Sequence, residues 1–157
     1  MRKADITTRI DAVGYSELSD ADRALVDTAR RATYRAYAPY SHFSVGAAIL
    51  LSNGETVSGS NQENAAFPSG LCAERTAAFY AHSTYPDARF VTIAISARGT
   101  DGTALAAPIA PCGACRQVLL EYETLAGQDV KVILDGKEEI FIIPSVRSLL
   151  PVAFSEI

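Results

Sequence analysis

The sequence predicts a mixed α/β fold in which a sheet of about five strands is covered by helices. The predicted elements follow the order helix, strand, strand, helix, strand, helix, strand, strand, which is typical of a mixed sheet with helices packed on it. The chain shows no internal repeat, no low-complexity segment and no linker rich in proline, glycine or serine. Because 157 residues is the length of one domain, we expect a single domain over residues 1–157, with an N-terminal arm, 1–18, of uncertain order.

The first predicted helix follows this arm. Residues 18–38 offer Ser19 or Asp20 as an N-cap, and their apolar positions recur at helical spacing. We expect this helix to end before Pro39.

A β-hairpin is predicted next, over residues 43–62. Two β-prone runs flank the dipeptide Asn53-Gly54, which favours a type I′ turn because both central residues of that turn need a positive φ.

The second half of the chain continues the alternation of helix and strand. A helix begins near Cys72, and another begins near Cys112. The other predicted elements are a buried strand at 90–97, an irregular segment at 99–111, strands at 129–135 and 138–144, and a short helical turn at 145–150.

Composition and charge narrow the possible functions. The chain is 48% hydrophobic and 20% charged, with a net charge of -4 and dispersed basic residues, which argues against a polynucleotide-binding protein. It shows no signal-peptide layout and no apolar run of the roughly 18 residues that a membrane span needs. We therefore expect a cytoplasmic protein without nucleic-acid or membrane partners that acts on a small neutral substrate.

Three cysteines suggest a metal site. Cys112 and Cys115 are three residues apart at a helix start, so both can point at one ion. Cys72 begins another helix, where the helix dipole favours a thiolate. Glu74 is two residues from Cys72, about 200° around a helix, so it is better placed to border an open metal position than to bind the ion. Three protein ligands with an open fourth position are typical of catalytic zinc.

Other interpretations of these residues remain open. A C-x-x-C pair alone is also typical of structural zinc or of a redox pair, and structural zinc would need a fourth ligand. His42 lies in a predicted loop, and His82 is about 15 Å of axial rise from Cys72, so neither histidine is an obvious ligand. A glutamate in the first turn of a helix can also be a surface residue that offsets the helix dipole.

The cysteine and glutamate pattern matches a known signature. Cys-Ala-Glu followed by Pro-Cys-x-x-Cys matches the zinc deaminases, whose glutamate does not bind the metal. The segments PYSHFSVGAAI, NQENAAFPSGLCAERTA and APCGACRQVL together resemble the cytidine deaminase family, specifically its small, homotetrameric, all-cysteine branch. The resemblance runs from about Tyr34 to Phe154. It implies a three-layer α-β-α fold and a homotetramer whose active sites are shared between subunits.

The resemblance also implies roles for the residues of the metal site. Cys72, Cys112 and Cys115 would hold one Zn²⁺ per chain, and Glu74 would shuttle protons. Three thiolates leave the zinc site with a net charge of -1, which opposes ionisation of bound water. The resemblance assigns Arg75 to hydrogen bonds with the ligand sulfurs, which would withdraw some of that charge.

Further positions match the substrate contacts of the family. Asn61 and Glu63 would bind the ribose hydroxyls, and Phe43 would face the pyrimidine. The remaining matched substrate contacts are Ala73, Phe67 and, from a neighbouring subunit, Phe154. Phe67 stands where many relatives have tyrosine, so a hydroxyl contact there is absent. The sequence does not separate the roles of Arg116 and Gln117.

The resulting hypothesis is zinc-dependent hydrolytic deamination of cytidine and 2′-deoxycytidine to uridine and 2′-deoxyuridine plus ammonia, a step of pyrimidine salvage. A related aminohydrolase acting on a nucleoside-like antibiotic such as blasticidin S is one alternative. A non-catalytic zinc module is another, and it predicts a closed fourth ligand and no need for Glu74.

Overall fold

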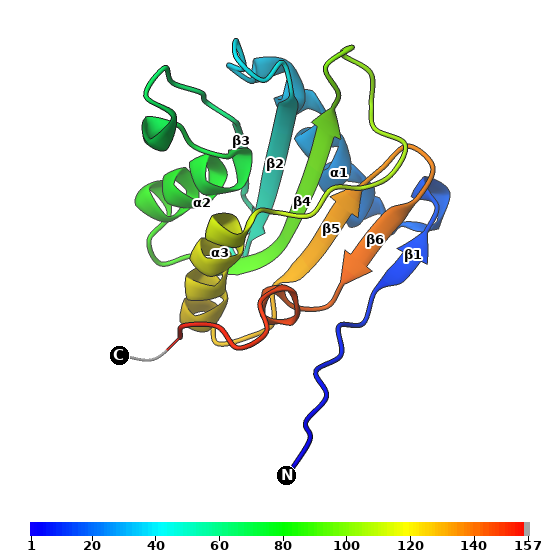
Figure 1. Ribbon diagram of the computed structural model, residues 1–157, viewed down its shortest axis with the longest axis vertical. Helices are drawn as coiled ribbons and strands as arrows, with labels where there is room; N and C mark the ends of the chain where they lie inside the picture. Colours follow the sequence, from blue (N-terminus) through cyan, green and yellow to red (C-terminus); the bar gives the residue numbers. More distant parts are fainter. Residues whose placement is uncertain (156–157) are drawn as a thin grey trace.

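The computed structural model describes residues 1–155 and contains one mixed sheet (Figure 1). Across these residues six strands lie in the order β1-β6-β5-β4-β2-β3, with β4 and β5 parallel and every other neighbouring pair antiparallel. The strands are β1 (Asp11–Val13), β2 (Ser44–Leu51), β3 (Thr56–Ser60), β4 (Phe90–Arg98), β5 (Lys131–Asp135) and β6 (Ile140–Ile143). Residues 156 and 157 of the predicted domain lie outside the described residues.

Helices cover both faces of the sheet. They are α1 (Asp20–Ala32), α2 (Ala73–Thr84) and α3 (Gly113–Ala126), with 3₁₀ turns η1 (Tyr15–Glu17), η2 (Thr33–Arg35), η3 (Phe67–Ser69) and η4 (Val146–Leu149). Figure 1 shows α1 behind the sheet and α2 and α3 in front of it. No helix among residues 1–155 is both long and apolar enough to cross a membrane.

Two hydrophobic clusters form because successive strand residues point to opposite faces of the sheet. Ala48 and Ala94 pack with Val26 and Ala29 of α1. Their neighbours Ile49, Ile93 and Ile95 pack with alanines of α2 and with Leu119 and Leu120 of α3. The predicted three-layer α-β-α fold is confirmed, with α1 as one outer layer.

The predicted strand count was one too low. The additional strand is β1, which lies in the N-terminal arm and pairs antiparallel with β6 from Asp11 to Val13. Its three residues are mostly exposed, so they carry no apolar alternation that would identify a strand in the sequence. The second half of the arm is therefore part of the sheet edge.

The hairpin between β2 and β3 is confirmed, but its predicted type I′ turn is wrong. Gly54 has a positive φ of 86°, whereas Asn53 is not among the residues with positive φ. The Gly54 N–H donates to the Leu51 carbonyl, and the Asn53 side chain accepts from the Glu55 N–H. Four residues, 52–55, connect the strands, and a single left-handed glycine suffices in such longer loops.

The N-terminal ends of α1 and α2 show how the helices are fixed. Ser19 caps α1 by accepting from the Asp22 N–H, and the helix ends at Ala32, where η2 takes over before Pro39. Gly59 lets α2 lie directly on β3, because a Cβ there would come within 2.5 Å of the Ala77 nitrogen. This close approach holds the start of α2, and with it Cys72, against the sheet.

Candidate metal centre

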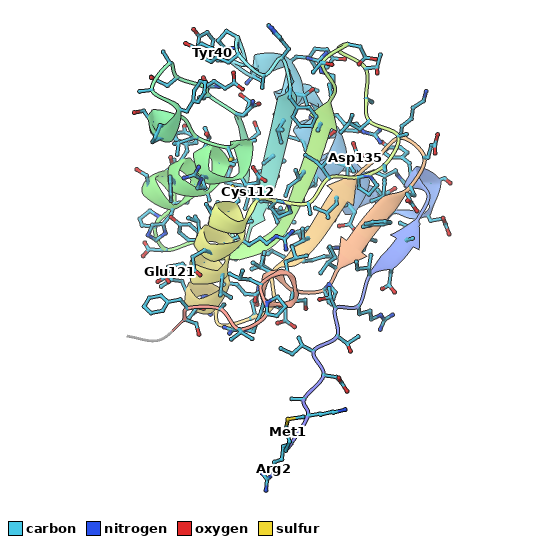
Figure 2. All side chains as sticks on the ribbon, viewed as in Figure 1. Met1, Arg2, Tyr40, Cys112, Glu121 and Asp135 are labelled. Carbon is cyan, nitrogen blue, oxygen red and sulfur yellow. The ribbon has the colours of Figure 1, made fainter. Side chains whose placement is uncertain are left out.

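The three cysteines converge where two helices begin. Cys72 is the N-cap residue of α2, Cys112 is the N-cap residue of α3, and Cys115 lies in the first turn of α3. Their sulfur atoms all lie within 4.8 Å of one another, and the Cys72 and Cys112 sulfurs are 3.8 Å apart. Figure 2 shows Cys112 where α3 comes close to α2.

This sulfur geometry fits zinc. A tetrahedral site with Zn–S bonds of about 2.3 Å places two sulfur ligands about 3.8 Å apart, which matches the separation of Cys72 and Cys112. Among residues 1–155 no histidine, aspartate, glutamate or further cysteine joins the cluster as a fourth ligand. The cluster therefore fits one Zn²⁺ per chain with one coordination position left for a non-protein ligand.

Contacts within the cluster shift the pKa values of Cys72 and Cys115 in opposite directions. Hydrogen bonds from Cys115 and Arg75 lower the pKa of Cys72 to about 5. The hydrogen bond to Cys72, together with burial, raises the pKa of Cys115 far above its ordinary value. The low pKa of Cys72 favours its thiolate, the form that binds a metal.

Glu74 is buried beside this cluster. Its side chain, in the first turn of α2, is 4% exposed and forms no salt bridge with any of residues 1–155. Burial, and secondarily the charge of Cys72, raises the pKa of Glu74 above the ordinary glutamate value. A carboxyl group in such surroundings is suited to accept and return a proton near neutral pH.

Arg75 contacts the cluster from the same helix. Its Nη2 lies 3.8 Å from the Cys72 sulfur and donates to it, and this contact raises the pKa of the Arg75 guanidinium. Its Nε is buried without a hydrogen-bond partner among residues 1–155. The arginine therefore places positive charge next to one sulfur of the three-cysteine cluster.

A pocket of about 510 Å³ opens next to the cluster. Cys72 and Arg75 line it on one side, and Asn61 and Glu63 belong to its wall as well. Its volume falls within the range of about 300 to 1,000 Å³ that is usual for small-molecule sites. The other residues that line it are Tyr40, Ser41, Gln62, Asn64, Phe67, Gly70 and Leu71.

Asn61 is held by the end of the loop before β2 and by the start of β2, and Glu63 is held by the same loop. The Asn61 amide accepts from the Val45 N–H at 2.8 Å and donates to the Phe43 carbonyl at 2.9 Å. The Glu63 carboxylate accepts from the Tyr40 N–H at 2.9 Å, from the Ser41 N–H at 3.2 Å and from the Ser41 hydroxyl. These hydrogen bonds, led by that of the Ser41 hydroxyl, lower the pKa of Glu63.

The apolar residues predicted to contact the substrate differ in their position relative to the pocket. Phe67 lines the pocket, is 72% exposed and packs edge-on against Tyr40 at 5.6 Å between ring centroids. Phe43 is partly buried directly before β2 and is not among the residues that line the pocket. Ala73 is fully buried between Cys72 and Glu74.

Phe154 is 69% exposed and is likewise not among the residues that line the pocket of its own chain. The Gln117 side chain donates to the Phe154 carbonyl at 2.8 Å, and Arg116 donates to the carbonyls of Pro111 and Leu149. Arg116 and Gln117, which directly follow Cys115 on α3, thus bind the C-terminal segment to this helix.

Two further polar residues were not predicted from the sequence. Ser41 bonds to Glu63 inside the pocket wall, and Glu123, buried on α3, accepts from four donors near the C-terminal segment. Ser41 lies within the family-like segment PYSHFSVGAAI, which could have drawn attention to it. Glu123 carries no such signal, because its position resembles any polar residue of a surface helix.

Comparison with known proteins agrees with this geometry. Residues 19–126 match the family model described as the cytidine and deoxycytidylate deaminase zinc-binding region. A cytidine deaminase of Halalkalibacterium halodurans is 40% identical over 131 residues, 83% of this chain and 92% of that protein. The crystal structure of cytidine deaminase from Burkholderia pseudomallei is similar with a TM-score of 0.72 and 38% identity, covering 87% of this chain and 100% of that one. The Mycobacterium tuberculosis enzyme gives 0.68 and 35%, over 88% and 99%.

Proposed function

The chain belongs to the cytidine deaminase family of zinc-dependent aminohydrolases, and from that premise we propose that it deaminates cytidine and 2′-deoxycytidine at C4. The products would be uridine or 2′-deoxyuridine and ammonia. The observation that carries this proposal is the three-cysteine cluster beside a pocket, with the buried Glu74 next to it and no fourth protein ligand among residues 1–155. A structural zinc module would have a closed fourth position, which makes that alternative the weaker one.

Zinc would be held by Cys72, Cys112 and Cys115. When bound, the ion supplies Lewis acidity that brings the pKa of water toward neutrality. Arg75 would lower the electron density on the Cys72 sulfur through its hydrogen bond, and the positive ends of the α2 and α3 dipoles act in the same direction.

Glu74 would carry the protons. Its carboxylate would take a proton from the attacking water as the oxygen bonds to C4 of the pyrimidine. It would deliver that proton to N3, then take the second proton from the new C4 hydroxyl and pass it to the exocyclic nitrogen, so that a C4 carbonyl forms as the C4–N bond breaks and ammonia leaves. The raised pKa of this buried carboxyl supports the assignment, because a group that both takes and gives a proton works best with a pKa near the working pH.

The other residues predicted to contact the substrate would hold the nucleoside. Asn61 and Glu63 would bind sugar hydroxyls, and their position in the same pocket as Cys72 supports a substrate that spans base and sugar. Phe43 would face the pyrimidine, while Phe67 and the backbone at Ala73 would border it. The family's proteins include cytidine deaminases by name, which favours a free nucleoside over an antibiotic analogue.

We further propose that the chain forms one domain, acts in the cytoplasm in pyrimidine salvage, and assembles into a homotetramer. In this assembly Phe154 of each subunit would complete a neighbour's pocket. The exposure of Phe154 and its absence from the pocket of its own chain support this arrangement, because an apolar side chain gains stability when a partner covers it.

An ultraviolet assay of cytidine loss with purified, zinc-loaded protein tests the activity. We expect turnover of cytidine and 2′-deoxycytidine, no turnover after zinc removal, and little turnover of blasticidin S. The Glu74→Gln protein with full zinc content is the matched control for contaminating deaminases. Wild-type protein with full zinc that leaves cytidine intact would refute the proposal. Preferential turnover of blasticidin S would instead identify the protein as an aminohydrolase of that antibiotic.

A further inference from the structure

The loop between η2 and β2 is fastened to one side of the pocket. Residues 37–43 run beside residues 61–63, where the Tyr37 N–H donates to the Asn61 carbonyl and the Glu63 N–H donates to the Tyr37 carbonyl. Tyr40 and Ser41 then meet the Glu63 side chain, and all of these contacts lie at the pocket wall. The shape of this wall therefore depends on how the loop and Glu63 hold each other.

The Ser41 hydroxyl stands in the middle of a short hydrogen-bond chain. The Phe43 N–H donates to the Ser41 oxygen at 3.1 Å, and the Ser41 hydroxyl donates to Oε1 of Glu63. The first bond fixes the side-chain rotamer of Ser41, so that its single proton points at the carboxylate. Chains of this kind strengthen each member, because each bond polarises the next.

The backbone between Ser41 and Phe43 is strained. His42 has a φ of 54°, in the left-handed region that residues other than glycine rarely adopt. Such a conformation persists only where surrounding contacts hold it, and strained residues concentrate at functional sites. The His42 N–H donates to the Ala38 carbonyl, and the Ser41 side chain spans the strained residue from the other side.

The loop leaves part of the Glu63 carboxylate free to accept a further hydrogen bond. A carboxylate offers about four lone-pair positions, and the loop occupies three of those on Glu63. The carboxylate is therefore fixed in orientation while roughly one acceptor position remains for a substrate hydroxyl. Its lowered pKa favours the ionised form, in which both oxygens act only as acceptors.

We propose that Ser41 is a positioning residue, whose hydroxyl orients the Glu63 carboxylate for recognition of a sugar hydroxyl. The inference rests on the proposed deamination of cytidine and adds a residue that does not itself contact the reacting atoms. It predicts that Ser41 matters for substrates with a 2′- or 3′-hydroxyl and hardly at all for a substrate that lacks both.

The test compares Ser41→Ala and Ser41→Thr with the wild type on cytidine and on 2′,3′-dideoxycytidine, which lacks the 2′- and 3′-hydroxyls and keeps the 5′-hydroxyl. Loss of one hydrogen bond to an oriented group corresponds to roughly a two- to tenfold change. We expect Ser41→Ala to raise KM for cytidine by that factor, with kcat changed less than about twofold. The change in kcat/KM for dideoxycytidine should stay below about twofold, and Ser41→Thr, which keeps the hydroxyl, should restore most of the cytidine KM.

Two controls separate positioning from general damage. Ser16→Ala removes an exposed hydroxyl that makes no hydrogen bond with residues 1–155, and its kinetics should match the wild type. Combining Ser41→Ala with Glu63→Ala should add little to the loss caused by Glu63→Ala alone, because Ser41 acts through that carboxylate.

Each other outcome overturns the inference. Unchanged cytidine kinetics in Ser41→Ala would show that Glu63 needs no orientation. Equal losses on cytidine and dideoxycytidine, or a Ser41→Ala protein that does not fold, would assign Ser41 a purely structural role. A zinc-loaded wild type that does not deaminate cytidine would instead refute the proposed function, and this inference with it.

Discussion

Glu123 provides the sharpest test of how the C-terminal part of the chain is held together. Its carboxylate lies on α3 at 5% exposure and accepts from the N–H groups of Val130, Val146 and Arg147 at 2.9, 2.7 and 3.0 Å. The Ser145 hydroxyl donates to it as well, at 2.9 Å. One side chain therefore joins α3 to the start of β5 and to η4.

The expected cost of Glu123→Ala follows from these contacts. Arg147 N–H keeps a second acceptor in the Ser145 hydroxyl, whereas the Val130 and Val146 N–H groups lose their partner inside the protein. A buried donor left without a partner costs about 1 to 3 kcal/mol. With two such donors, we expect the free energy of unfolding to fall by about 2 to 6 kcal/mol, a large share of the roughly 5 to 15 kcal/mol typical of proteins.

Urea unfolding of zinc-loaded protein, followed by tyrosine fluorescence, measures this loss, since the chain has seven tyrosines and no tryptophan. Glu121→Ala is the matched control, because Glu121 is exposed on the same helix and forms no side-chain hydrogen bond or salt bridge with residues 1–155. Its substitution should change stability by less than about 0.5 kcal/mol. A Glu123→Ala protein within about 1 kcal/mol of the wild type would refute the reasoning, since the four contacts would then be replaceable by water.

The other predictions concern the metal centre and the shared pocket. Glu74→Gln should keep zinc and the fold but lower kcat by about 10² to 10⁴, because an amide cannot carry protons; wild-type-like turnover in zinc-replete protein would remove Glu74 from the mechanism. Cys112→Ala should lose zinc in metal analysis, and unchanged zinc content would contradict the site. Contacts within the cluster raise the pKa of Cys115, so zinc binding should release a proton from this thiol. Zinc affinity should then rise about tenfold per pH unit from pH 6 to 8 in competition titrations, and a flat profile would contradict this. Phe154→Ala should raise KM for cytidine without loss of zinc, and sedimentation of a fully active monomer would exclude a shared site.

Much of the fold could be predicted from the sequence because local signals were strong. α1 combines the Ser19 cap with apolar residues at helical spacing, and β4 is a nearly continuous apolar run of strand length. α2 and α3 have no side-chain cap, but their buried residues recur at helical spacing. β1 has neither, because its pairing with β6 depends on backbone hydrogen bonds between segments far apart in the sequence. The predicted type I′ turn at Asn53-Gly54 was wrong for a similar reason. The register in which β2 pairs with β3 sets the length of the loop between them.

The cysteines of the metal centre could be predicted from their chemistry, whereas the roles of Ser41 and Glu123 could not. Thiols at helix starts with a C-x-x-C spacing have few uses other than metal binding or redox chemistry, so residue type alone narrows the choice. Ser41 and Glu123 are common polar residues with many possible roles. Their partners, Glu63 and residues 130 and 145–147, are identified only when the chain is folded.

Helix α3 links the metal centre to the C-terminal segment. Its first turn carries Cys115 and follows Cys112, while Arg116 and Gln117 bind the carbonyls of Leu149 and Phe154. Glu123, about two turns further on, fixes the start of that same segment. A shift of α3 would therefore move two metal-ligating sulfurs and the Phe154 backbone together. If Phe154 completes a neighbour's pocket, α3 has two tasks. It positions Cys112 and Cys115 in its own subunit, and it also sets the position of the Phe154 side chain that enters the neighbouring subunit.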